Sequence, residues 1–154
     1  MPTPTDTRLL LDVMVGGLTS ILRMLGYDVV YALDRDAEQD DALTQLAQAE
    51  NRTVITRDRQ IAARYDPTVL LHSTDTDVQL AELHEAGFEL SLGEPARCSA
   101  CNGRLVRVET GPGPAAGPDP EAEAVWQCRE CGQYFWQGSH WDDVRDRLAS
   151  ITSD

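Results

Sequence analysis

The sequence contains no lysine, so all 13 of its basic residues are arginine, and they stand against 26 acidic residues. The formal net charge of −13 indicates a well-solvated, self-repelling surface. It argues against broad, non-specific binding of nucleic acid, although a local basic path remains compatible with it. Two interpretations of this balance stay open: adaptation to high intracellular salt, as in a halophile, and a high-GC genome that encodes arginine in place of lysine.

Long apolar runs are also missing, which argues against a membrane-spanning helix. Residues 1–8 lack the basic start and apolar core of a secretory signal, so we expect a cytoplasmic protein with no membrane contact. With 42% apolar residues among 154, the chain has enough material for a packed domain plus a small module. We therefore expect one domain over residues 8–92 and a second unit over residues 96–150.

Short apolar runs alternate with amphipathic stretches through the first part of the chain. The apolar runs predict strands over residues 8–12, 28–32, 52–56 and 68–73. The amphipathic stretches predict helices over residues 14–25, 40–51, 58–65 and 77–86. This alternation indicates βαβ units, so the predicted fold class is α/β: a parallel sheet with flanking helices. A small module and a helix over residues 141–151 are expected to follow it.

Only four cysteines are present, and they form two pairs of equal spacing: Cys98 with Cys101, and Cys128 with Cys131. Two such turns supply four thiolates that complete the tetrahedral shell of zinc, so we expect a structural zinc ribbon with no open catalytic position. The alternatives are two disulfides, disfavoured without an export signal, and a redox CxxC, which needs only one pair. The Gly- and Pro-rich residues 110–124 between the pairs predict a loop.

Aspartates follow the predicted strands at the edge where parallel α/β sheets bind ligands. Asp12 ends the first strand, Asp58 follows the third, Asp75 and Asp77 follow the fourth, and Asp40 opens the helix after the second. Carboxylates that converge from separate strands repel each other unless a cation lies between them, and oxygen-only clusters favour Mg²⁺ or Mn²⁺. The alternative is that each aspartate is a turn or N-cap residue, as Asp58 would be for the helix that follows it.

Three segments together resemble the Mut-seven C-terminal RNase family, in which a PIN-like nuclease domain is fused to a C-terminal zinc ribbon. They are LLLDVMVGGLTSILRMLGYDVVYA, QDDALTQLAQAENRTVITRDRQI and RCSACNGRL…WQCRECGQYFWQGSHW. The resemblance extends from about residue 8 to 148, and the YFWQGSHW that follows a CxxCG turn is its most specific part. It implies a PIN-like fold and metal-dependent cleavage of single-stranded RNA.

The resemblance also implies roles for the acids. Asp12, Asp40 and Asp58 match acids that hold a catalytic Mg²⁺ or Mn²⁺. Asp77, or Asp75 in its place, matches a fourth catalytic acid more loosely.

Several other side chains are expected to serve the same site or its substrate. The hydroxyl of Thr56 is expected to order the site, and three arginines are expected to contact RNA: Arg23, Arg57 and Arg104. For Arg23 and Arg57, an ion pair with a neighbouring acid is the alternative. The aromatic residues of QYFWQGSHW either stack on bases or build the core of the ribbon. The basic residue that the family usually carries before LRMLGYD is absent, since this chain has GGLTS there.

Three functions follow as hypotheses. The first is a metal-dependent endoribonuclease that hydrolyses phosphodiester bonds at the acids. The second is an RNA- or ribosome-binding adaptor that keeps the fold without the chemistry. The third is a PIN-type toxin, which a fused ribbon disfavours.

Overall fold

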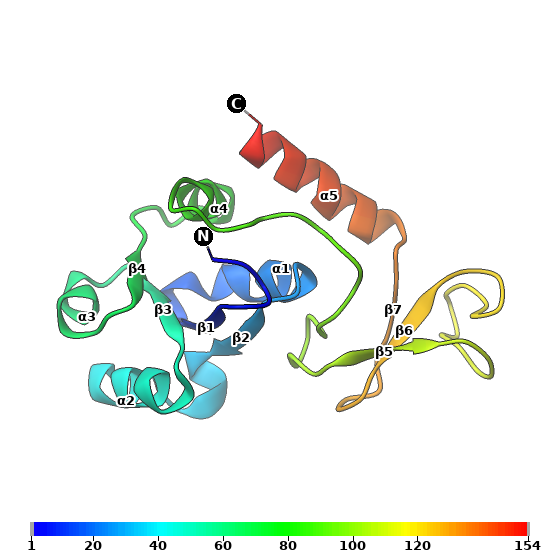
Figure 1. The fold of residues 1–154 in the computed structure, drawn as a ribbon, viewed down its shortest axis with the longest axis horizontal. Helices are drawn as coiled ribbons and strands as arrows, with labels where there is room; N and C mark the ends of the chain where they lie inside the picture. Colours follow the sequence, from blue (N-terminus) through cyan, green and yellow to red (C-terminus); the bar gives the residue numbers. More distant parts are fainter. Residues whose placement is uncertain (1, 154) are drawn as a thin grey trace.

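The computed structural model describes residues 2–153 and contains two sheets joined by a linker (Figure 1). Within these residues, the larger sheet has four parallel strands in the order β2-β1-β3-β4. In chain order the strands are β1 (Arg8–Leu11), β2 (Asp28–Tyr31), β3 (Thr53–Thr56) and β4 (Thr68–Leu70). The predicted parallel sheet is confirmed, and β2 forms one of its edges.

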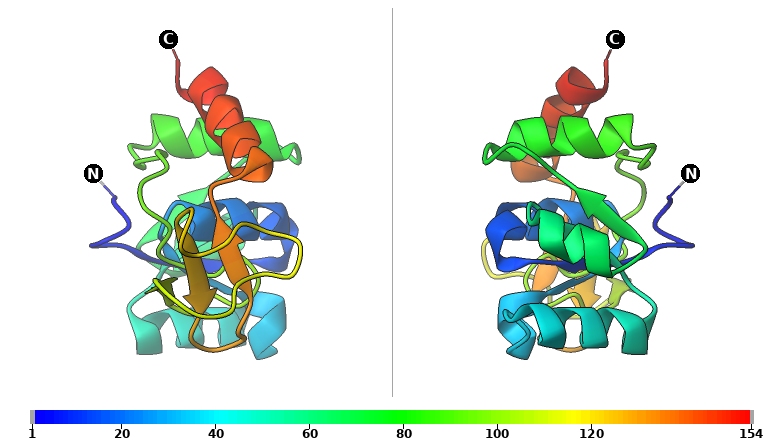
Figure 2. Two further views of the ribbon diagram at one scale, coloured as in Figure 1. Left: turned by 90° about the vertical axis from the view of Figure 1, so that its right-hand side faces the viewer. Right: turned by 90° about the vertical axis from the view of Figure 1, so that its left-hand side faces the viewer.

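Helices cover both faces of this sheet, and Figure 2 shows the resulting layers. On one face, Leu9 and Leu11 of β1 share a core with residues of α1 (Thr19–Met24) and α4 (Thr76–Glu85). On the other face, Leu10 shares a core with residues of α2 (Asp40–Glu50) and α3 (Arg59–Arg64). Since β1 is buried on both sides, every position of its LLL run is apolar.

The predicted first helix is wrong in its first half. There the chain forms a 3-10 turn, η1 (Val13–Leu18), and becomes α-helical only at α1. Glycine is a poor helix former, and a Cβ on Gly16 would lie 2.6 Å from the hydroxyl of Tyr31, so η1 passes too close to β2 to carry a side chain there. Gly26, at φ +99°, follows the end of α1 as expected, and a second 3-10 turn, η2 (Ala32–Arg35), follows β2.

The smaller sheet lies in the ribbon and is antiparallel, in the order β5-β6-β7. Its strands are β5 (Leu105–Val108), β6 (Val125–Cys128) and β7 (Tyr134–Trp136). The long Gly- and Pro-rich connection between β5 and β6 forms neither strand nor helix, which confirms the predicted loop.

The last helix, α5 (Ser139–Thr152), returns from the ribbon to the larger domain and packs against α4. Val144 and Leu148 are buried in the same core as Leu80 and Leu83 of α4. By packing, α5 therefore belongs to the domain of the parallel sheet as much as to the ribbon that precedes it. No helix in the described part of the chain has the length and apolar character needed to cross a membrane.

Candidate functional site

Asp12 lies directly after β1, at the carboxyl edge of the parallel sheet, and is 3% exposed. Its Oδ1 accepts a hydrogen bond of 2.7 Å from the amide of Val13, and its Oδ2 accepts one of 2.7 Å from the hydroxyl of Thr56. No cationic side chain within residues 2–153 forms an ion pair with it. A buried carboxylate is usually paired with a cation or bound to a metal, so Asp12 is the acid whose environment most needs an ion.

Asp58 lies at the same edge, two residues beyond β3, the strand next to β1. Its amide donates to the Thr56 hydroxyl at 3.0 Å, while its Oδ1 accepts from the amide of Gln60 at 2.8 Å and so caps α3. The predicted capping role is therefore observed, and it leaves the second carboxylate oxygen with no protein donor among the described residues. Because Thr56 donates to Asp12 and accepts from Asp58, its hydroxyl connects the two strand ends.

Asp40 opens α2 and is half-exposed. Its carboxylate lies 3.8 Å from Arg64 of α3, whose guanidinium also pairs with Asp41. Part of the negative charge at the start of α2 is thus compensated by the protein itself. Pairs of this exposure contribute little to stability, so Arg64 does not prevent Asp40 from turning toward an ion.

The acids after β4 have other partners. Asp75 caps α4, since its Oδ1 accepts from the amide of Val78 at 3.1 Å. Asp77 is exposed in the first turn of α4 and forms an ion pair with Arg147 of α5. Asp77, which was expected as a fourth catalytic acid, therefore lies in a contact between α4 and α5.

The acids do not gather into a tight cluster in this structure. Among residues 2–153, the only group of three or more His, Cys, Asp or Glu side chains whose ligand atoms all lie within 4.8 Å of one another is the set of four cysteines. Asp12 and Asp58 share the Thr56 hydroxyl, whereas Asp40 is contributed by a separate helix.

The three expected RNA-contacting arginines lie in different places. Arg57 follows β3 at the acid edge, and its buried Nε has no hydrogen-bond partner in the described chain. Arg104 is exposed and lines a cavity together with Arg8, which begins β1, whereas Asp12 follows the end of that strand. Arg23 is 5% exposed, and its hydrogen bonds within the described chain go to backbone carbonyls, so the structure argues against the expected phosphate contact.

The four cysteines come together as predicted, in an arrangement that could hold a metal ion such as zinc. The Sγ atoms of Cys98 and Cys131 are 3.7 Å apart, and those of Cys101 and Cys128 are 3.5 Å apart. A zinc ion with Zn–S bonds of about 2.3 Å requires sulfur–sulfur separations of about 3.8 Å, so four thiolates at these distances fit a tetrahedral zinc ion. None of the four is in a disulfide.

Backbone geometry in the second cysteine turn is suited to binding a metal ion. The amides of Glu130 and Cys131 each lie 3.4 Å from the Sγ of Cys128. Although burial opposes it, these amides lower the pKa of the Cys128 thiol to about 7, whereas burial raises the pKa of Cys98 to about 12. A thiol with a lowered pKa is partly ionised at neutral pH, and zinc binding would displace the remaining protons.

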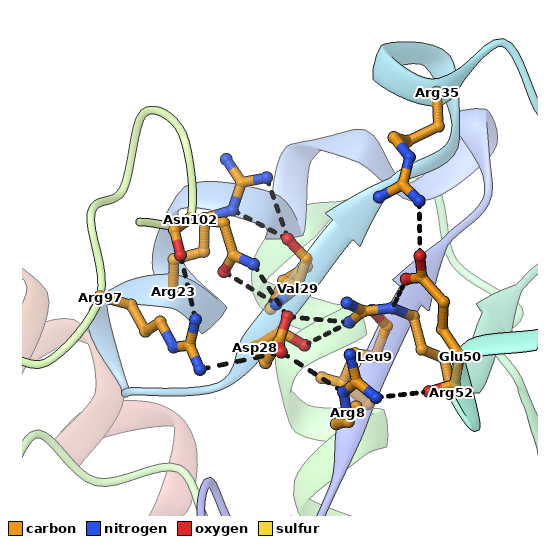
Figure 3. A network of polar contacts seen from close by, with 10 residues as sticks. All are labelled: Arg8, Leu9, Arg23, Asp28, Val29, Arg35, Glu50, Arg52, Arg97 and Asn102. Atoms are coloured by element: carbon orange, nitrogen blue, oxygen red, sulfur yellow. Dashed lines mark hydrogen bonds and ion pairs between the residues drawn. The ribbon is translucent and has the colours of Figure 1, made fainter. Parts of the chain in front are cut away.

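The first cysteine turn also docks the ribbon onto the larger domain, at the free edge of β2 (Figure 3). Asn102 has φ +72° and projects its side chain onto this strand: Oδ1 accepts from the amide of Val29 at 3.0 Å, and Nδ2 donates to Asp28 at 2.8 Å. Arg23 bridges the same junction, since it donates to the carbonyl of Val29 and to those of Ser99 and Ala100. The exposed backbone of an edge strand is thereby satisfied by the zinc ribbon.

Asp28 is the centre of this junction. Arg52 donates to it at 2.9 Å, and Arg97 and Arg8 lie 3.7 Å and 3.4 Å from its carboxylate (Figure 3). Although burial alone would raise it, hydrogen bonds from Asn102 and Arg52 hold the pKa of Asp28 at about 2. This role was not predicted, and its only signals in the sequence are the Asp of LRMLGYD and the Asn after the second cysteine.

A comparison with protein families agrees with this geometry. The family model described as the Mut7-C RNAse domain matches residues 7–148, which is nearly the whole chain. No curated protein and no solved structure matches the chain. The α/β fold, the four-cysteine centre and the match over most of its length identify this chain as a member of the Mut7-C RNAse domain family.

Proposed function

We propose that this protein is a metal-dependent endoribonuclease whose site is built on Asp12, Asp40 and Asp58. The observation that carries the proposal is the buried Asp12 carboxylate, which has two hydrogen-bond donors and no ion pair among the described residues, next to Asp58 across the Thr56 hydroxyl. The match to an RNase family supplies the class of reaction.

The donor set suits Mg²⁺ or Mn²⁺. These ions prefer carboxylate oxygens and water, and each oxygen of Asp12 keeps a lone pair beyond its one hydrogen bond. A bound ion would activate a water molecule and stabilise the charge that develops on the phosphodiester. In this proposal Asp12 and Asp58 hold the ion, Asp40 completes the site from the start of α2, and the Thr56 hydroxyl keeps Asp12 oriented. Asp77 is a looser fourth acid in this proposal, because its ion pair with Arg147 is as exposed as that of Asp40 with Arg64.

The substrate we propose is single-stranded RNA. Arg57 is the arginine best placed to meet a phosphate, because it follows β3 at the acid edge and its Nε lacks a partner in residues 2–153. Arg104 lies near the start of β1, away from the acids that follow the strands. It would therefore contact RNA only away from the scissile phosphate. A net charge of −13 predicts weak binding through phosphates alone, so the metal and base contacts must contribute.

The cysteine centre would hold a structural zinc ion rather than a catalytic one, because four thiolates leave no open position. We assign the nuclease unit to residues 8–92 and the ribbon to residues 96–138, with α5 completing the core of the nuclease unit. Cysteine thiolates bound to zinc are typical of a reducing compartment, which agrees with a cytoplasmic enzyme.

The test is cleavage of an end-labelled single-stranded RNA with Mn²⁺ or Mg²⁺ at high KCl. We expect Asp12→Asn and Asp58→Asn to lose activity by at least about 100-fold, because the metal loses a charged ligand. Asp143→Asn is the matched control, since this exposed acid on α5 carries no ion pair in the described chain. Zinc content and circular dichroism of each variant show whether its fold is intact.

The adaptor function is the second candidate, since the acids are not gathered within metal-binding distance of one another in this structure. It predicts that wild type and Asp12→Asn bind RNA equally and that neither cleaves it in either metal. Metal-dependent cleavage that both Asn variants retain would contradict the assignment of the site.

A further inference from the structure

A cavity of about 390 Å³ opens where the ribbon meets the start of α5, and none of Asp12, Asp40 and Asp58 lines it. Its walls come from residues 95–99 at the start of the ribbon, from Leu105 of β5, from Gln133 and β7, from Met24 of α1 and from the first turn of α5. Binding sites for small organic groups fall in this range of volume and combine apolar walls with a few polar groups.

Aromatic residues make up much of the lining. Tyr134, Phe135 and Trp136 of β7 and Trp141 of α5 are among the residues that line the cavity, and all four are half-buried. Because successive side chains of a strand point to opposite faces, Phe135 lies on the other face of β7 from Tyr134 and Trp136. The Tyr134 hydroxyl donates to the carbonyl of Pro112, and the Trp136 ring lies beside Gly117, so both contact the loop between β5 and β6. Phe135 and Trp141 are therefore the better candidates for a stacking surface. Aromatic rings held in this way are the usual platform on which unpaired bases stack, whatever the base.

The lining of the cavity is less acidic than the chain as a whole, although Asp142 and Asp143 directly follow Trp141. None of the residues lining it is an aspartate or glutamate, although the chain has 26 of them. Its two potential cations are Arg97 and His140. Arg97 shares its charge with Asp28, whereas His140 is exposed at the start of α5 and forms no ion pair in the described chain. A strand of RNA therefore meets less repulsion here than on an average part of the surface.

Polar groups suited to base edges lie beside the rings. Ser99 and Ser139 offer hydroxyls, and Gln133 offers an amide with both donor and acceptor atoms. Single-stranded RNA is recognised by this combination of stacking and hydrogen bonds to base edges. The cavity thus combines aromatic residues suited to a base with one arginine and one histidine in its lining.

We infer that this cavity binds an unpaired base of an RNA strand, with Trp141 and Phe135 as stacking residues and His140 next to the phosphate. The choice of RNA over another ligand rests on the proposed ribonuclease function. The cavity would hold the strand while another part of it reaches the acids. The cavity would thus be a positioning site, and none of its residues takes part in cleavage.

The test uses the full-length, zinc-loaded chain with Asp12→Asn as background and no added Mg²⁺ or Mn²⁺, so that binding is measured without cleavage. The probes are a fluorescein-labelled octauridine RNA and an abasic strand of the same length, compared by fluorescence polarisation. We expect the abasic strand to bind at least about 5-fold more weakly. Trp141→Ala and Phe135→Ala should weaken octauridine binding about 5- to 150-fold, and Trp141→Phe should restore most of it.

Val106→Ala is the control, because this exposed side chain of β5 lies on the ribbon but outside the cavity. It should bind octauridine like the Asp12→Asn parent. His140→Ala, which removes an exposed side chain and spares the aromatic walls, should weaken both probes alike, and it provides a test should a ring variant fail to fold.

Two outcomes separate this inference from the ribonuclease proposal. If wild type cleaves no RNA but Asp12→Asn binds octauridine better than the abasic strand, the cavity assignment stands and the catalytic one falls. If the two probes bind alike, or if the ring variants and His140→Ala match Val106→Ala, the inference is wrong even where cleavage is intact. Displacement of octauridine by a proline-rich peptide, with no preference over the abasic strand, would instead assign the aromatic walls to a protein partner.

Discussion

Removal of the Asn102 side chain should weaken the contact between the ribbon and the edge of the sheet. The variant is Asn102→Gly, because a residue at φ +72° tolerates glycine without strain, whereas alanine would add a penalty of about 1 kcal/mol. The substitution deletes two contacts: the bond from the Val29 amide at 3.0 Å and the bond to the Asp28 carboxylate at 2.8 Å.

The magnitude follows from these two bonds. A neutral hydrogen bond contributes about 1 kcal/mol and one to a charged group about 1.5–3 kcal/mol. Water can replace part of this once the ribbon moves away, so we expect the free energy of unfolding to fall by about 2–4 kcal/mol. In a chain of this size that corresponds to a decrease in Tm of about 5–15 °C.

The assay is thermal and urea unfolding followed by circular dichroism, with zinc content measured on the same samples. Asn51→Gly is the matched control: Asn51 also has a positive φ, of 54°, but it is exposed at the end of α2 and its side chain makes no hydrogen bond in the described chain. The control should unfold within about 0.5 kcal/mol of wild type. If Asn102→Gly has the same free energy of unfolding as Asn51→Gly, the junction does not contribute to stability and the prediction is wrong.

Three further predictions test other parts of the molecule. The pKa of Asp28 is lowered to about 2, so the stability it confers is present above pH 4 and is lost as pH falls toward 2; urea unfolding should show this loss, about 2 kcal/mol, in wild type but not in Asp28→Asn. Gly103→Ala should lower zinc content measured by mass spectrometry, because its Cβ would lie 2.7 Å from the Sγ of Cys128; full occupancy would contradict the close approach. Thr56→Val should slow RNA cleavage at least about tenfold, while Thr56→Ser, which keeps the hydroxyl, should retain most of it, because that hydroxyl donates to Asp12; equal rates would exclude an orienting role.

Much of the fold could be predicted because its signals are local. Apolar runs of strand length, helices between them and a glycine at the end of α1 are features of neighbouring residues. The four-cysteine cluster could be predicted for the same reason, because each CxxC pair brings two sulfur atoms together within one short turn. The 3-10 turn before α1 was not predicted, although its two adjacent glycines, which are poor helix formers, were a local signal of it.

The candidate site could be predicted only in part. That Asp12 and Asp58 share one edge of the sheet follows from parallel strands, and the structure agrees. That Asp77 pairs with Arg147, and that Arg23 is buried at the junction with the ribbon, depends on how α5 and the first cysteine turn pack. An arginine or aspartate has the same appearance in a sequence whether it contacts a substrate or another part of its own chain.

The class of the fold, the four clustered cysteines and the membership of the Mut7-C RNAse domain family can be read from the sequence, because periodicity and spacing are properties of the linear chain. Which charged side chains have a partner depends on the tertiary structure. It surrounds Asp28 with arginines and leaves Asp12 buried with two hydrogen bonds and no ion pair among the described residues. The free energy of a charge depends on its burial and on its partners, and both are set by residues that are distant in the sequence.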